Sequence, residues 1–309
     1  MTKPEQKQPS KEESFRFEIV YLMPILASLI FGLGCAYVLL PQQQTEVIPV
    51  TPISQNTPAG SLGNALYFVI LVAAAATLFY LLLKRRSKKL IKALIVVAMT
   101  TASLLLSIVY LYAVFAYLPA SWGIAIIPIS IVITALFDLA IFRLNSVARN
   151  VAVVGVGGAL GIFFGFEIQL WTAIAILSFL AVYDVIAVYR GPVGKIAQSG
   201  MDDLQGLSFA FKDIQMGLGD LVFYSMLTGS MFFFFIKYLG LPLGIIPSLI
   251  SVVGIMAGSL VTFFMLTKRA IFPGLPFPIM IGIISGLVTG LVINPASLSH
   301  FYFVFSCNY

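Results

Sequence analysis

The chain has 309 residues, of which 60% are hydrophobic and 10% charged, against about 25% charged residues in ordinary soluble domains. A mean hydropathy of +1.03 excludes a soluble globular protein. The excess of 18 Lys and Arg over 12 Asp and Glu therefore reports membrane topology rather than a nucleic-acid partner. Two cysteines and one histidine support neither a disulfide framework nor a metal or haem centre, so we expect no metal and no cofactor.

Nine apolar stretches are long enough to cross a bilayer, which takes about 20 residues each. The expected spans are 19–40, 64–83, 90–118, 122–142, 149–166, 168–190, 217–238, 241–266 and 271–294. The chain is thus predicted to be an all-α polytopic membrane protein with nine transmembrane helices. The resulting segments are an N-terminal tail (1–18), helices one to six (19–190), a loop (191–216), helices seven to nine (217–294) and a C-terminal tail (295–309).

The placement of the basic residues predicts the orientation of these helices. When the segments between spans are assigned alternately to the two sides, every Lys and Arg except Lys237 falls on the same side. Because cytoplasmic segments carry the excess of basic residues, we expect the N-terminus and the 191–216 loop in the cytoplasm and the C-terminus outside. We expect the cell membrane as the location, and the loop is predicted to lie at the interface or to be mobile.

Glycines recur at four-residue spacing within three of the predicted helices. They are Gly157, Gly161 and Gly165, then Gly254 and Gly258, then Gly282, Gly286 and Gly290. Small residues at this spacing let membrane helices approach closely. We therefore interpret these positions as packing faces between helices.

Three acidic residues fall within apolar spans: Asp138, Asp184 and Asp220. An ionised carboxylate at the centre of a bilayer costs at least about 2.5–3.5 kcal/mol, so each requires an explanation. Asp138 lies near Arg143 at an inner helix end, where a locally neutralised interfacial acid is the favoured interpretation. Asp184 and Asp220 lie on consecutive antiparallel spans at similar depth, towards the cytoplasmic side.

This depth alone leaves three interpretations open for Asp184 and Asp220. Two close carboxylates can form an aspartyl dyad, in which one acts as a base on water and the other as an acid on a carbonyl oxygen. They can also serve as ligands in a proton- or cation-coupled transporter or channel. The third possibility is a pair of buried structural acids.

The sequence around these aspartates distinguishes the interpretations. Tyr183-Asp184 and Gly217-Leu218-Gly219-Asp220 resemble the YD and GxGD pair of presenilins and signal peptide peptidases, and Pro273-Gly274-Leu275-Pro276 is similar to the PALP segment of that family. The residues that follow, Arg190-Gly191-Pro192 and Phe223-Tyr224-Ser225, look closer to presenilin. The resemblance is specific over spans six to nine and rests on topology alone over spans one to five. The compactness of the chain, without large soluble insertions, suggests a microbial, archaeal homologue.

The resemblance implies an intramembrane aspartyl endopeptidase with Asp184 and Asp220 as the catalytic pair. It also implies that the other motif residues shape the site and its substrate contacts, namely Tyr183, Gly217, Leu218, Gly219, Pro273, Gly274, Leu275 and Pro276. The implied partners are the lipid bilayer and transmembrane peptides or single-span proteins with their N-termini outside. A homo-oligomer remains open, and the transporter stays the alternative function.

Two features depart from the family pattern. Gly274 stands where the family has Ala, and the 191–216 loop is much shorter than the loop in which presenilins are cleaved. We therefore expect an active single chain. We also hypothesise that the proline-containing segment offers extended backbone with which an unwound substrate can pair.

Overall fold

The computed structural model describes residues 19–44, 51–54, 57–85, 87–189, 208–211, 214–268 and 272–295. In chain order the elements are η1 (Ile19–Leu22), α1 (Met23–Leu39), η2 (Leu40–Gln44), α2 (Pro58–Lys84), α3 (Lys88–Phe115), η3 (Ala120–Ala125), α4 (Ile126–Phe142), α5 (Ser146–Glu167), α6 (Leu170–Tyr189), β1 (Ser208–Phe211), β2 (Ile214–Gly217), α8 (Leu218–Leu239), α9 (Leu241–Lys268) and α10 (Pro276–Ile293). Within these ranges nine helices are long and apolar enough to cross a membrane. The predicted nine-helix membrane architecture is therefore confirmed, whereas its orientation stays a prediction.

Several helix ends differ from the expected spans for local reasons. The second helix begins at Pro58, before the span expected from residue 64, because moderately polar residues continue the helix beyond the most apolar run. The last helix begins only at Pro276, since proline has no N–H to donate and is well accommodated in the first turn. Residues 272–275 are consequently non-helical, which leaves the proline-containing segment outside the helix expected from residue 271.

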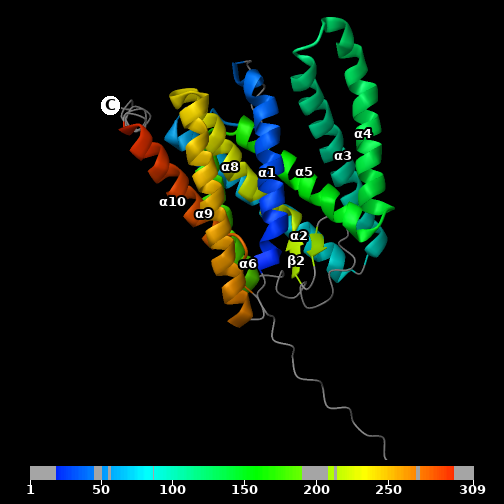
Figure 1. The fold of residues 1–309 in the computed structure, drawn as a ribbon. Helices are drawn as coiled ribbons and strands as arrows, with labels where there is room; N and C mark the ends of the chain where they lie inside the picture. Colours follow the sequence, from blue (N-terminus) through cyan, green and yellow to red (C-terminus); the bar gives the residue numbers. More distant parts are fainter. Residues whose placement is uncertain are drawn as a thin grey trace, which may run out of the picture.

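The centre of the bundle is α8. Of its most apolar stretch, 78% is buried, more than in any other spanning helix of the described residues. It packs between α5 and α9 and also contacts α1, α6 and α10. The α3–α4 pair forms a hairpin at one side of the bundle, as Figure 1 shows. The helix that carries Asp220 is thus held on several sides by other helices.

The glycine repeats lie where helices pack most closely, as predicted. A Cβ at Gly161 of α5 would overlap the Val222 carbonyl oxygen of α8, and one at Gly258 of α9 would come within 2.5 Å of Pro278 Cα of α10. The corresponding helix pairs, α5 with α8 and α9 with α10, make the most extensive contacts in the bundle. Glycine at these positions lets α8 and α10 approach their neighbours to backbone contact.

A small hairpin precedes α8 and was not predicted. The strands β1 and β2 pair antiparallel, with Ser208 opposite Gly217 and Phe211 opposite Ile214. They lie at the end of the segment that was expected to be a loop. The expectation of an interfacial or mobile loop falls mainly on residues 190–207 and 212–213, which lie outside the described residues. The described part shows that an ordered ribbon leads directly into the helix of Asp220.

Candidate active site

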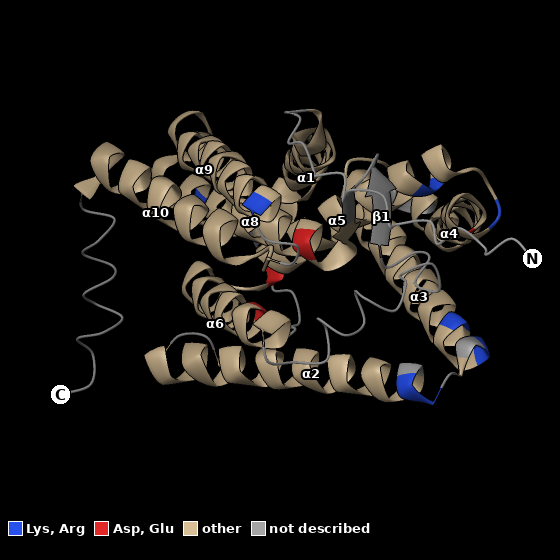
Figure 2. Cartoon of the chain, turned by 90° about the horizontal axis from the view of Figure 1, so that it is seen from below, with Lys and Arg blue, Asp and Glu red and all other residues tan. Residues whose placement is uncertain are grey.

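Each of the two aspartates lies near one end of its helix. Asp220 lies in the first turn of α8, which begins after the extended N-cap residue Gly217, so its carboxylate is favoured by the positive end of the helix dipole. Asp184 lies on α6, near the end that leads towards Tyr189. The two helices contact each other, and Figure 2 shows acidic positions on α6 and α8 where these helices face one another.

The segment before α10 joins the two carboxylates. The backbone N–H of Leu275 donates a 3.0 Å hydrogen bond to Asp184 Oδ2, and the Gly274 backbone also bonds this carboxylate. On the other side, a Cβ placed on Gly274 would lie 3.3 Å from Asp220 Oδ2. Two consecutive residues therefore lie beside the two carboxylates, and the structure brings the YD, GxGD and PALP-like segments together in one place.

The hydroxyl of Tyr224 fixes the position of this segment. It donates a 3.0 Å hydrogen bond to the Gly274 carbonyl oxygen, and the Tyr224 side chain is only 1% exposed. Tyr224 lies one helical turn after Asp220 on α8, within electrostatic reach of both aspartates. In the sequence it was noted only as part of the Phe223-Tyr224-Ser225 resemblance. Its contact with Gly274 joins residues far apart in the chain, and no local pattern signals it.

A cavity of about 160 Å³ lies beside Asp220. Its polar wall consists of Asp220, Tyr224, Ser259 and Thr262, and apolar side chains from β2, α9 and the segment before α10 complete it. A water molecule occupies about 30 Å³ in the liquid and needs two to four polar partners when buried. The cavity is therefore large and polar enough to hold several water molecules next to one of the two carboxylates.

The two glycines of the GxGD segment do not pack against another helix. A Cβ at Gly217 would have as its nearest neighbours Gly219 N at 3.9 Å and Asp220 Oδ2 at 4.0 Å, and one at Gly219 would meet only Phe223 Cε2 at 3.7 Å. These distances are ordinary van der Waals contacts. Among the described residues, the glycines leave open space beside Asp220, unlike the tightly packed glycines of α5 and α9.

The remaining predicted site residues take more ordinary positions. Leu218 is 7% exposed, and its side chain would lie 3.2 Å from a Cβ placed on Gly157 of α5, so it contributes to helix packing. Pro273 is buried, and Pro276 occupies the first turn of α10. Tyr183 is half buried and makes no hydrogen bond to another described residue. Its position next to Asp184 in the chain is the only feature that connects it with the site.

The third intramembrane acid lies elsewhere. Asp138 on α4 accepts a 2.7 Å hydrogen bond from the Thr100 hydroxyl of α3. This contact satisfies one carboxylate oxygen by an interhelical bond within the α3–α4 hairpin. Asp138 is therefore a partner of α3 and not of the Asp184 and Asp220 carboxylates. No group of three or more metal-ligating His, Cys, Asp or Glu side chains occurs in the part of the chain that the structure describes.

Comparisons with known proteins agree with this arrangement. The model of the family described as signal-peptide peptidase, presenilin aspartyl protease matches residues 29–202, a range that includes Asp184 and ends before Asp220. Two solved structures of a presenilin family intramembrane aspartate protease share the fold. The structure in space group C222 has a TM-score of 0.63 at 22% identity and covers 88% of this chain and 98% of its own. The structure in space group P2 has a TM-score of 0.62 at 23% identity, with 90% and 100% covered.

No curated protein matches the chain. The family match nevertheless extends over more than half of the sequence, and the nine spanning helices are those of a multi-pass membrane protein. The chain therefore belongs to the signal-peptide peptidase and presenilin family of aspartyl proteases.

Proposed function

We propose that Asp184 and Asp220 are the catalytic pair with which this membrane protease hydrolyses peptide bonds inside transmembrane segments. The observation that carries the proposal is the contact of both carboxylates with the same dipeptide, Gly274-Leu275. It brings two acids from different helices to one place, where the two carboxyl groups interact electrostatically. The family relationship supports a protease and does not support a transporter.

The proposed reaction uses the two carboxyl groups in opposite roles. The ionised carboxylate removes a proton from a water molecule as the water oxygen attacks the scissile carbonyl carbon. The protonated carboxyl group donates its proton to the carbonyl oxygen, which gives a neutral tetrahedral diol. When the C–N bond breaks, the carboxyl group that took the proton from water donates it to the leaving amine. The other carboxylate takes a proton from a diol hydroxyl, which restores the starting state of the pair. The cavity beside Asp220 is the proposed source of the water.

The substrate must lose its helical hydrogen bonds at the scissile bond, because the backbone carbonyls of a membrane helix are otherwise occupied. Pairing of the segment before α10 with the unwound substrate stays a prediction. Two of its groups already have partners, since the Leu275 N–H bonds Asp184 and the Gly274 carbonyl accepts from Tyr224. The outer edges of the β1–β2 hairpin next to Gly217 are a second surface on which extended backbone can pair.

The remaining parts of the proposal concern the substrate and the setting of the enzyme. We propose that the substrates are single-span proteins with their N-termini outside and that the enzyme resides in the cell membrane. Tyr183, Gly217, Gly219 and the residues before α10 are proposed to shape the site around the scissile bond. The enzyme is proposed to act as a single uncleaved chain.

Reconstitution in liposomes distinguishes the protease from the transporter. Purified protein is incubated with a labelled single-span peptide, and cleavage is followed by mass spectrometry, with proton and cation flux measured in parallel. We expect new peptide termini within the apolar segment and no flux above protein-free liposomes. Flux that depends on Asp184 and Asp220, with no cleavage of several single-span peptides, would instead favour the transporter.

A further inference from the structure

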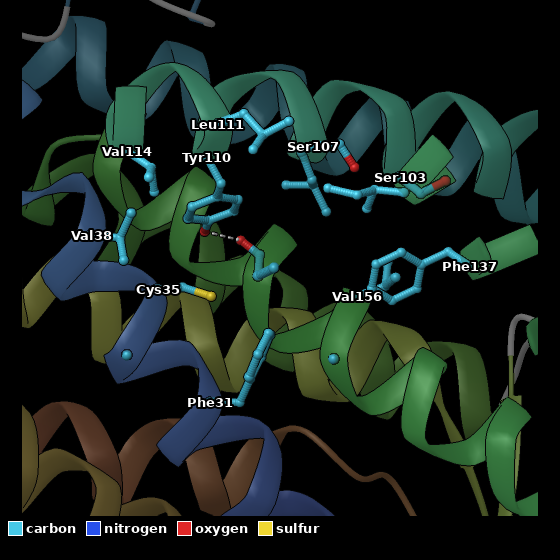
Figure 3. A pocket seen from close by; sticks show the side chains of 15 residues that line it. Phe31, Cys35, Val38, Ser103, Ser107, Tyr110, Leu111, Val114, Phe137 and Val156 are labelled. Carbon is cyan, nitrogen blue, oxygen red and sulfur yellow. Dashed lines mark hydrogen bonds between the residues drawn. The ribbon is translucent and has the colours of Figure 1, made fainter. Parts of the chain in front are cut away.

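A second and larger cavity lies in the other half of the molecule. It measures about 420 Å³ and is lined by residues of α1, α3, α4 and α5, which places it within the range of about 300–1,000 Å³ typical of ligand pockets. Neither aspartate, nor any residue of α6, α8 or α10, lines it. Figure 3 shows side chains of α3 on one side and of α1 and α5 on the other pointing into this space.

The lining is mainly apolar, with three hydroxyl groups, those of Ser103, Ser107 and Tyr110. Two of these three hydroxyls have hydrogen-bond partners within the protein. The Tyr110 hydroxyl donates a 2.8 Å hydrogen bond to the Ala159 carbonyl oxygen, which is drawn as the dashed line in Figure 3. The Ser103 hydroxyl donates a 2.8 Å bond to the Met99 carbonyl oxygen of its own helix. Buried water needs polar partners that are not otherwise satisfied, and apolar cavities stay dry. The chemistry of the wall therefore favours an apolar occupant over water.

The cavity opens towards the lipid. Phe31 of α1 and Val114 of α3 line it and are 49% and 44% exposed. Both residues lie within spanning helices, so this opening meets the hydrocarbon of the bilayer rather than water. The most abundant apolar group there is the acyl chain of a lipid.

The volume of the cavity favours an acyl chain over a transmembrane helix as its occupant. A spanning helix about 10 Å wide and about 30 Å long occupies roughly 2,400 Å³, several times the 420 Å³ that the cavity provides. A complete spanning helix therefore does not fit inside it. A single flexible hydrocarbon chain can enter from the side.

Two glycines keep this space open. A Cβ at Gly34 would meet nothing within 4 Å, and one at Gly155 would meet only Phe31 Cε1 at 3.8 Å. Three residues further along α5, by contrast, a Cβ at Gly158 would lie 2.6 Å from the Ser28 carbonyl oxygen. Gly158 thus serves helix packing, whereas Gly34 and Gly155 face unfilled volume. The absence of side chains at these two positions accounts for part of the cavity.

We propose that this cavity binds one acyl chain of a bilayer lipid, held between α1, α3 and α5. Helix α5 contributes to the wall of this cavity and also packs against α8, the helix of Asp220. This inference does not depend on the assignment of the catalytic pair.

The test uses the full-length enzyme in lipid nanodiscs that contain a phospholipid with a photoactivatable diazirine in its acyl chain. After irradiation, modified residues are located by peptide mass spectrometry. We expect adducts on cavity residues of α3 such as Leu106, which is 5% exposed, and Tyr110. Gly155→Leu, which places a bulky side chain in the open space, should lower them severalfold. Gly155→Ala is the matched control, since it leaves most of the volume free and should retain the adducts.

Other outcomes would overturn the proposal. Undiminished adducts in Gly155→Leu would show that the label reaches these residues from the outer surface, and adducts confined to a co-purifying protein would show a different occupant. In a Cys307→Ser background, rapid reaction of Cys35, which lines the cavity, with a charged thiol reagent would show that the cavity holds water. If Gly155→Leu does not accumulate, Gly34→Leu tests the same space from α1.

Discussion

The Tyr224 hydroxyl donates a 3.0 Å hydrogen bond to the carbonyl oxygen of Gly274. This bond connects the helix of Asp220 to the segment whose next N–H group, that of Leu275, bonds Asp184. Two hydrogen bonds, made by adjacent residues of this segment, therefore connect the helix of Asp220 to the carboxylate of Asp184. Tyr224 is a positioning residue in this account, because its hydroxyl acts on the carboxylates through the backbone of Gly274.

Replacement of Tyr224 by Phe removes this bond and leaves the ring in place. A hydrogen bond contributes about 0.5–1.5 kcal/mol net, so we expect kcat to fall about two- to twelvefold with little change in KM. Steady-state cleavage of a labelled peptide measures both constants. Tyr37→Phe is the control, since Tyr37 is 63% exposed on the outside of α1. Equal kcat values for wild type and Tyr224→Phe would contradict the positioning role.

Substitutions of Gly274 test how much space is available next to Asp220. A Cβ there would lie 3.3 Å from Asp220 Oδ2, which is close enough that the carboxylate must shift by a few tenths of an ångström. We expect Gly274→Ala to retain cleavage, as alanine is the residue of the family at this position. We expect Gly274→Val to lose at least about fivefold in kcat, because overpacking costs about 1–3 kcal/mol. Full activity in Gly274→Val would refute the contact with Asp220.

Two glycines on α5 provide a matched test of helix packing. A Cβ at Gly161 would overlap the Val222 carbonyl oxygen of α8, whereas one at Gly155 has no neighbour closer than 3.8 Å. We expect Gly161→Ala to lower the free energy of unfolding by about 1–3 kcal/mol and Gly155→Ala to leave it unchanged. Unfolding in a denaturing detergent titration gives both values. Similar destabilisation by the two substitutions would argue against the α5–α8 packing described above.

Substitution of Asp138 tests whether an intramembrane acid outside the candidate site is needed for cleavage. Its carboxylate accepts a 2.7 Å hydrogen bond from Thr100 and lies on the α3–α4 hairpin. Asn keeps an acceptor oxygen for this bond, so we expect Asp138→Asn to cleave substrate at a rate close to that of wild type. A loss of cleavage in a folded Asp138→Asn protein would show that the chemistry extends to this acid.

The sequence was sufficient to predict the features that depend on composition and on strong local motifs. Long apolar runs have few alternatives to spanning helices, and all nine helices were predicted. Asp184 and Asp220 could be placed at similar depth because consecutive spans alternate in direction. The packing glycines Gly161 and Gly258 followed from their four-residue spacing.

The features that escaped prediction depend on contacts between distant parts of the chain. The hydrogen bond from Tyr224 to Gly274 depends on how α8 and the segment before α10 are placed relative to each other. No periodicity in the sequence predicts that placement. The β1–β2 hairpin is a short ribbon in a segment of mixed polarity, where local propensity is weak. The partner of Asp138 proved to be Thr100 on the preceding helix, a contact set by how α3 packs on α4.

The most direct test of the central claim compares Asp184→Asn and Asp220→Asn with wild type and Asp138→Asn. Each purified protein is incubated in liposomes with the same single-span peptide, after gel filtration and circular dichroism have established that it is folded. The account predicts that Asp184→Asn and Asp220→Asn both lose cleavage to background while Asp138→Asn retains it. Substantial cleavage by folded Asp184→Asn or Asp220→Asn would contradict the proposed catalytic pair.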